Sequence, residues 1–211
     1  MSEGPLAQDI DFLARRRWPG RTIGFGRRAW LTMTAPEIWL LAMYRLCHWR
    51  LERLEQRGGN GQPLHLRLAG YLFGIGEWIG RVRCKSEVLA KSSIEPGVCL
   101  PRRGFLILGA RRVGSGTVIG TRTTVGMRLA DGGVPEIGRN VWIGEDCVVY
   151  GPIQVGDGVT LLPGTVLSRS VPPGVVLDGN PARVVRRDFD NHFLRMKERL
   201  TPSDIAQARS L

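Results

Sequence analysis

The chain has 211 residues, of which 43% are hydrophobic and 23% charged, so it is long enough to bury a core and resembles soluble globular proteins in composition. These values exclude a mini-protein that depends on disulfides or metal ions for its stability, and they exclude a wholly disordered chain. The formal net charge of +11 favours anionic partners such as polyanions, acidic lipid headgroups or a phosphate-bearing cofactor.

The positive charge is spread along the chain and forms no basic tail. Lysine and arginine outnumber acids by 14 to 8 through Ala90 and by 16 to 11 beyond it. The sequence has no zinc-finger spacing, helix-turn-helix pattern or aromatic RNA-binding motif, so we expect no nucleic acid among its partners.

The cysteines and the apolar stretches indicate where in the cell the protein is located. Cys47, Cys84, Cys99 and Cys147 are scattered without the paired spacing of a metal site, and we expect no metal and a reducing cytoplasm. The longest apolar stretches are interrupted by charged residues and are shorter than the ~18–20 residues that cross a bilayer. We therefore predict a cytoplasmic protein without a transmembrane helix.

The first part of the chain has helical spacing. From Pro36, apolar residues recur every three or four positions until Gly58, which predicts a helix of about twenty residues. A second apolar segment, 64–79, carries three glycines that disfavour a straight helix. Before both, the arginine-rich stretch 9–28 predicts a short helix and a loop. This stretch is either a peripheral contact with acidic lipid at the inner membrane face or an ordinary solvated surface.

The second part of the chain repeats with a period of six. Aliphatic anchors recur at every sixth position, glycine often follows them, and the position two before them is often apolar or small. The anchors are Val113, Ile119, Val125, Ile137, Ile143, Val149, Val155, Leu161 and Leu167, with Asp131 as the exception. The phase extends back through Val88, Ile94 and Leu100 and slips by one residue across 101–109. Neither a helix nor a simple strand uses this period, so it indicates short strands joined by regular corners.

The repeat predicts a β-solenoid with three faces per turn and about five coils between Val88 and Leu167. A twisted β-sandwich with coincidental spacing is the alternative. We predict a basic helical region over 1–86 that caps one end, the solenoid over 87–187, and a helical tail over 188–211. Phe189, Phe193, Met196 and Leu200 form a stripe of the tail, which we expect to pack on the solenoid or on a neighbour.

Three stretches resemble the hexapeptide-repeat acyltransferases, and most closely their serine acetyltransferase branch. They are 44–49 ahead of the repeats, the repeats from Val113 to Leu167, and a closing signature over 171–185 that includes Gly179-Asn180-Pro181-Ala182-Arg183. The resemblance implies a left-handed parallel β-helix that assembles as a homotrimer or within a trimer-based assembly. It also implies acetyl-CoA in grooves between adjacent β-helices and transfer of the acetyl group to a hydroxyl of serine or of a sugar or polysaccharide precursor.

The resemblance also assigns candidate residues for binding acetyl-CoA. The corners that face the cofactor are Gly144, Glu145, Leu162, Pro163 and Gly164, although the resembling enzymes favour glycine or alanine at positions 145, 162 and 163. Arg183 and Arg186, beside the exit of the last coil, are candidates for the CoA phosphates or ordinary surface arginines. A carboxylate at 145 would oppose these phosphates unless Arg139 or another arginine pairs with it.

The family's catalytic histidines are missing, and this leaves the activity open. Arg102 and Val134 stand at the two equivalent positions, and His48, His65 and His192 all lie outside the repeats. Asp131, in the loop equivalent to the active-site loop, is a candidate general base or a solvent-facing loop residue, and Arg102 is the second catalytic candidate. The chain is therefore either a CoA-dependent O-acetyltransferase with a rearranged or missing base, or a catalytically silent protein that binds a CoA-like or other anionic ligand or assembles with an active paralogue.

Overall fold

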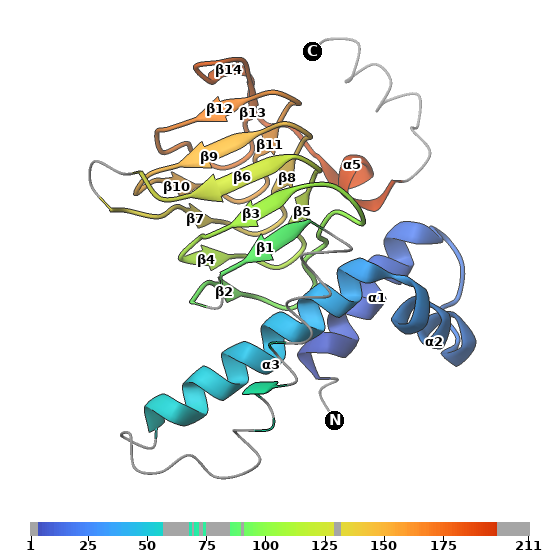
Figure 1. Cartoon of the computed structure of the whole chain (residues 1–211). Helices are drawn as coiled ribbons and strands as arrows, with labels where there is room; N and C mark the ends of the chain where they lie inside the picture. The colour runs from blue at the N-terminus through green and yellow to red at the C-terminus, as the bar shows by residue number, and fades with distance from the viewer. Residues whose placement is uncertain are drawn as a thin grey trace.

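The computed structural model describes residues 4–56, 68, 70–71, 74, 85–89, 91–128 and 132–197. From residue 86 onward the chain winds as a left-handed parallel β-helix, in which equivalent strands of successive coils pair in parallel (Figure 1). The β-sandwich alternative is therefore wrong, because the strands from β1 to β13 pair with the strand one coil away rather than with their neighbour in sequence.

The coils build three sheets, which we call A, B and C in the order in which the chain visits them. Sheet A contains β1 (Ser86–Val88), β3 (Leu106–Leu108), β6 (Thr123–Gly126), β9 (Val148–Tyr150) and β12 (Val166–Leu167). Sheet B contains β2 (Ser93–Ile94), β4 (Arg112–Val113), β7 (Glu136–Ile137) and β10 (Gln154–Val155). Sheet C contains β5 (Val118–Ile119), β8 (Trp142–Ile143), β11 (Thr160–Leu161) and β13 (Val176–Asp178), and β14 (Arg183–Arg186) adds to its edge in antiparallel orientation.

The predicted anchors form the core of the β-helix. All nine aliphatic anchors from Val113 to Leu167 are at most 4% exposed, and the residues two positions before them, such as Val141 and Val159, are buried as well except for Arg111. The glycine after an anchor is required because the next coil passes very close. A Cβ on Gly114 would lie 2.6 Å from the carbonyl oxygen of Gly138. The six-residue repeat thus results from packing of the anchors in the interior and from close contact between coils at the glycine corners.

The register departs from eighteen residues in several coils, and two of the departures bear on the sequence predictions. Val88 pairs with Leu108, so the predicted slip across 101–109 is confirmed as a longer corner ahead of β3. Val125 pairs with Val149, and Val113 pairs with Ile137. In both pairs the partner lies twenty-four residues later in the sequence, six more than the eighteen of a regular coil. The hexad that contains Asp131 therefore forms no strand of the coils, and the expectation of an uninterrupted repeat is wrong there.

Helices cover the first end of the β-helix, as predicted. They are α1 (Pro5–Arg17), α2 (Phe25–Thr34) and α3 (Pro36–Gln56), the last being the helix expected from Pro36. Leu41 and Tyr44 of α3 join the buried core, and the Tyr44 hydroxyl accepts a hydrogen bond from the backbone N–H of Ile94 at 3.0 Å. Most of the predicted segment 64–79 lies outside the described residues. Among the described helices, none is long and apolar enough to cross a membrane.

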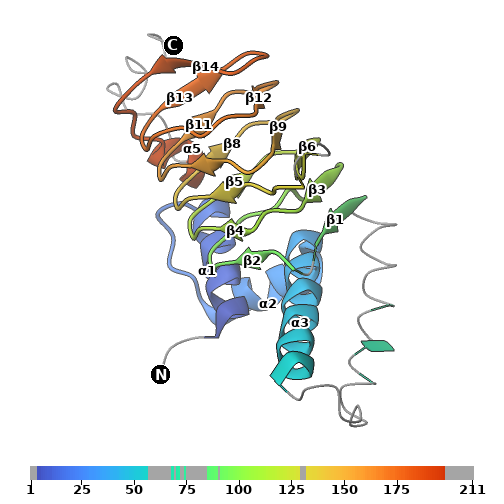
Figure 2. The same ribbon diagram turned by 90° about the vertical axis from the view of Figure 1, so that its left-hand side faces the viewer.

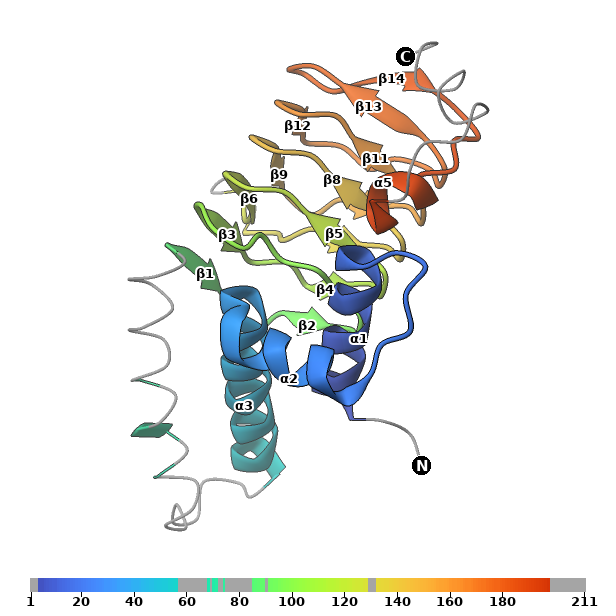
Figure 3. The same ribbon diagram turned by 90° about the vertical axis from the view of Figure 1, so that its right-hand side faces the viewer.

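The three sheets differ in what covers them. Figure 3 shows α1 and α5 (His192–Met196) on the outer side of sheet C, where Phe189 and Phe193 pack against Val176. The tail thus packs on the solenoid as expected, but its described helix is only five residues long. Sheet A has no described helix over its outer face (Figures 1 and 2), which presents the half-buried Ile107, Thr124, Val148 and Val166.

Candidate active site

One edge of the β-helix gathers most of the predicted site residues. It consists of the corners that lead from sheet C to sheet A, and we call it the C–A edge. Arg102 lies on the first of these corners, Gly144 and Glu145 lie on the third, and Leu162, Pro163 and Gly164 lie on the fourth. The coils are stacked through backbone bonds at these corners, for example from the N–H of Gly164 to the carbonyl of Glu145 at 2.9 Å. The structure therefore brings the predicted cofactor corners and Arg102 onto one edge.

An ion pair that the sequence did not reveal links two corners of this edge. Arg122 donates to both carboxylate oxygens of Asp146 at 2.5 Å, and its Nη2 atom lies 3.7 Å from Glu145. Both residues have positive φ, +55° and +58°, which points their side chains outward at equivalent corner positions. The hydrogen bond from Arg122 lowers the pKa of the Asp146 carboxyl, which is therefore a weak base at neutral pH.

The arginine beside Glu145 is therefore Arg122 and not Arg139. Arg139 lies on the corner between sheets B and C, where it donates to Glu95 at 3.1 Å. A positive charge next to Glu145 offsets the repulsion that this carboxylate would exert on a phosphate. The C–A edge thus carries the cations Arg102 and Arg122 beside the acids Glu145 and Asp146.

The two predicted glycines on the edge differ in their surroundings. A Cβ on Gly144 would lie 2.8 Å from the backbone nitrogen of Pro163, so this glycine is required by the stacking of the coils. Gly164 has a φ of +80° and nothing within 4 Å of the Cβ position, so it leaves open space on the edge. Leu162 packs against the cluster that contains Phe189 and Phe193 and is held by the tail.

The two arginines proposed for the CoA phosphates lie at opposite ends of β14. Arg183 pairs with Asp178 across the hairpin, next to the last corner of the C–A edge, and its side chain is exposed. Arg186 pairs with Val176 at the far end of β14, about 10 Å further along the strand. Its guanidinium carbon lies 5.5 Å from the centre of the Phe189 ring. Only Arg183 therefore borders the C–A edge.

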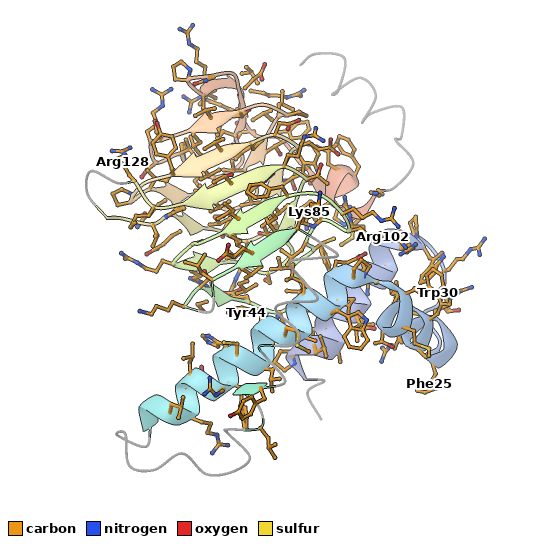
Figure 4. The ribbon with its side chains drawn as sticks, viewed as in Figure 1. Phe25, Trp30, Tyr44, Lys85, Arg102 and Arg128 are labelled. Carbon is orange, nitrogen blue, oxygen red and sulfur yellow. The ribbon has the colours of Figure 1, made fainter. Side chains whose placement is uncertain are left out.

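The loop that contains Asp131 leaves the β-helix at a different edge, between sheets A and B. Asp131 itself lies outside the described residues, but the base of the loop is defined by a hydrogen bond from the N–H of Arg128 to the carbonyl of Gly133 at 3.2 Å. Arg128 also stacks 5.5 Å from the Tyr150 ring and donates to the carbonyl of Ser168 at 3.0 Å. Figure 4 shows Arg128 and Arg102 on opposite sides of the β-helix. Arg128, at the base of this loop, and Arg102 therefore lie on different edges of a single chain.

The described histidines and cysteines provide no replacement base or nucleophile on the C–A edge. His48 lies on α3, where it stacks on Tyr44 and pairs with Glu52 at 3.3 Å, and His192 begins α5. Burial raises the pKa of Cys99 and of Cys147 to about 11, so both remain thiols at neutral pH. The described residues contain no group of three or more His, Cys, Asp or Glu that could hold a metal ion.

Comparison with known proteins finds similarity to acetyltransferases. Residues 135–169 match the family model "Bacterial transferase hexapeptide (six repeats)". The chain is 39% identical over 59 residues to galactoside O-acetyltransferase of Escherichia coli K12, which is 27% of this chain and 29% of that protein. It is 25% identical over 158 residues to the serine acetyltransferase of Buchnera aphidicola subsp. Schizaphis graminum, or 70% of this chain and 52% of that protein.

A solved serine acetyltransferase in complex with CoA has the same fold, with a TM-score of 0.64 and 20% identity over 85% of this chain and 68% of that chain. The chain thus spans about half or less of the length of both curated relatives, while the fold match extends through most of its own length.

Proposed function

Because residues 135–169 carry the hexapeptide repeat of bacterial transferases and the C–A edge gathers the predicted cofactor corners, we propose that the protein is an acetyl-CoA-dependent O-acetyltransferase. The observation that carries this proposal is the C–A edge, with its open Gly164 corner and with Arg122 and Arg183 beside it. Arginine guanidinium groups bind phosphates through charge-assisted hydrogen bonds. The CoA solved with a structural relative supports the choice of donor.

The site is completed between copies of the chain in this proposal. Arg128, at the base of the Asp131 loop, and Arg102 lie on the two edges that flank sheet A, and the outer face of this sheet carries the half-buried Ile107, Val148 and Val166. Packing this face in a closed trimer brings the loop of one subunit against the C–A edge of the next. The trimer therefore buries the apolar face and assembles the two catalytic candidates in one step.

The proposed reaction needs a base because an alcohol is a poor nucleophile at neutral pH. The hydroxyl oxygen of the acceptor attacks the thioester carbonyl while Asp131 takes its proton. The C–S bond then breaks, and CoA leaves as a thiol after receiving that proton. Arg102 supplies a positive charge next to the developing oxyanion or the substrate, since its guanidinium cannot act as a base.

The acceptor in this proposal is a hydroxyl of serine or of a saccharide. A relative named for galactoside O-acetylation and another named for serine acetylation support both classes. We place the reaction in the cytoplasm, where acetyl-CoA is available, and the three described cysteines are free thiols, as expected there.

The missing histidines support a second candidate function, in which the chain is catalytically silent and assembles with an active paralogue. All three histidines lie outside the hexads, while the aliphatic anchors of the hexads are buried. Under this alternative, trimers of this chain alone are inactive and mixed trimers with the paralogue are active.

Calorimetric titration of CoA and acetyl-CoA into the purified protein tests the proposal, with ATP as the control for general attraction to phosphate. We expect CoA to bind well above ATP, and an acceptor screen that measures released thiol should then show turnover with at least one hydroxyl compound. Asp131→Asn should lower turnover without weakening CoA binding. Absence of CoA binding would refute the enzyme proposal, and binding without turnover by the homotrimer would favour the silent partner.

A further inference from the structure

Every exposed charged side chain described on α1, α2 and the turn between them is cationic. Residues 12–36 contain six arginines and no acidic residue. The acids of this region precede it and are buried: Asp9 pairs with Arg45, and Asp11 pairs with Arg28 at 2.8 Å. Each exposed charged group from residue 12 to residue 36 is therefore an arginine.

The outer face of α2 exposes large apolar side chains among these arginines. Phe25 is 87% exposed, Met33 is 80% exposed and Trp30 is 45% exposed. Phe25 and Met33 lie two helical turns apart along one stripe, whereas Leu31 on the other face is fully buried with Ile38 and Leu13. The inner face already anchors α2, so the fold does not need the outer apolar face.

Arg17 and Arg27 lie next to aromatic rings, whereas Arg28 pairs with the buried Asp11. The guanidinium carbon of Arg17 lies 5.0 Å from the centre of the Trp30 ring, and that of Arg27 lies 5.8 Å from the Trp18 ring. Figure 4 shows Phe25 and Trp30 projecting away from the β-helix. The α2 surface, defined by Phe25, Trp30 and Met33 with Arg17 and Arg27, therefore combines exposed apolar groups with a uniform positive charge.

From this combination we propose that the α2 surface docks the protein on an anionic lipid bilayer. Aromatic and apolar side chains enter the boundary between headgroups and acyl chains, while arginines remain at the headgroup level and attract acidic lipids. A second copy of the chain fits less well, because two uniformly cationic surfaces would repel each other. This docking is distinct from the proposed acetyl transfer because the α2 surface shares no residue with the C–A edge, although Arg17 and Arg102 both act on the carboxyl of Glu37.

Flotation of the full chain with vesicles tests the proposal. One set of vesicles contains about one third phosphatidylglycerol in phosphatidylcholine, and the other contains phosphatidylcholine alone. We expect the protein to float with the anionic vesicles only, and to be released by high salt because screening weakens the attraction.

The Phe25→Ser/Met33→Ser variant removes the apolar contacts and should weaken vesicle binding at least tenfold. The matched control is Phe105→Ser/Met127→Ser, which makes the same two changes at side chains that are about half exposed on the β-helix. This control should bind like the parent protein. A charge variant, Arg21→Gln, should weaken binding more than Arg111→Gln, which removes one exposed arginine of the β-helix.

Three results would overturn the proposal. The first is that the parent protein does not float with anionic vesicles, and the second is that the α2 variant binds them as well as its control does. Gel filtration without lipid provides the third, since a smaller assembly for the α2 variant alone would make this surface an interface between copies. The thermal transition of each variant checks that it is folded. Measuring CoA binding by the same variants distinguishes failure of the lipid-docking proposal from failure of the acetyltransferase proposal.

Discussion

Replacing Asp9 by alanine should strongly destabilise the junction between the helices and the β-helix. Asp9 is fully buried and accepts hydrogen bonds from Arg45 Nε at 2.7 Å, Arg45 Nη2 at 3.1 Å and the backbone N–H of Gly97 at 2.7 Å. It thereby joins α1, α3 and the first coil. In the Asp9→Ala variant, the guanidinium of Arg45 and the backbone N–H of Gly97 lose these acceptors. The Arg45 side chain is only 17% exposed, so little water can replace them.

Breaking one partner of a buried ion pair costs about 3–5 kcal/mol, a large part of the stability of an ordinary domain. For a chain of this size we expect the melting temperature to fall by about 6–20 °C. Burial raises the pKa of the Asp9 carboxyl, against hydrogen bonds from Arg45 and Gly97 that lower it, so a neutral side chain of the same shape is tolerated better. Asp9→Asn should therefore cost less than half as much as Asp9→Ala.

Thermal unfolding at a fixed protein concentration measures both variants. The control is Glu136→Gln, which breaks an ion pair with Arg111 whose side chains are 67% and 36% exposed and should cost less than about 1 kcal/mol. A melting temperature for Asp9→Ala within the range of this control would show that the buried pair does not hold the helices on the first coil.

Three further predictions concern the coils and the cofactor. Gly114→Ala should lower stability by about 1–3 kcal/mol in urea unfolding, because its Cβ would meet the next coil at 2.6 Å, whereas Gly126→Ala, with nothing within 4 Å, should be neutral or stabilising. Burial opposes ionisation of Glu95, but hydrogen bonds from two arginines and a backbone N–H outweigh it and lower its pKa to about 2. The resulting ~1 kcal/mol of stability should be present above pH 4.5 and lost as the pH falls toward 2, and Glu95→Gln should abolish this pH dependence in unfolding titrations. Arg183→Gln should weaken CoA binding about tenfold in calorimetry, while Arg111→Gln should not, and equal effects would indicate general attraction to charge.

The fold was accessible from the sequence because its interior obeys a simple rule. Each hexad places one aliphatic side chain inside, so residues such as Val113 and Leu161 could be identified as core from their spacing alone. The helix from Pro36 was equally clear from its apolar spacing. The covering of sheet C by α1 and α5 was less accessible, since contacts such as that of Arg16 with the carbonyl of Leu194 at 2.9 Å join residues far apart in sequence.

Which residues lie on the C–A edge depends on whether one hexad, the one around Asp131, forms a strand. The sequence alone does not reveal this, so it could not assign residues to the edge. If every hexad formed a strand, each would advance the chain by one face, and Ile143 and Leu161 would fall in sheet A. Because the hexad around Asp131 leaves the coil, all later strands are shifted by one face, and these two residues lie in sheet C.

The same shift sets which charged residues meet. Arg122 stands beside Asp146, twenty-four residues later, rather than beside Asn140, which is eighteen residues later and lies on another edge. Glu145 and Gly164 therefore share an edge with Arg102 only because the loop exists. In the proposed enzyme, the excursion that presents Asp131 to a neighbouring subunit is also what aligns the cofactor corners with the remaining cations of the site.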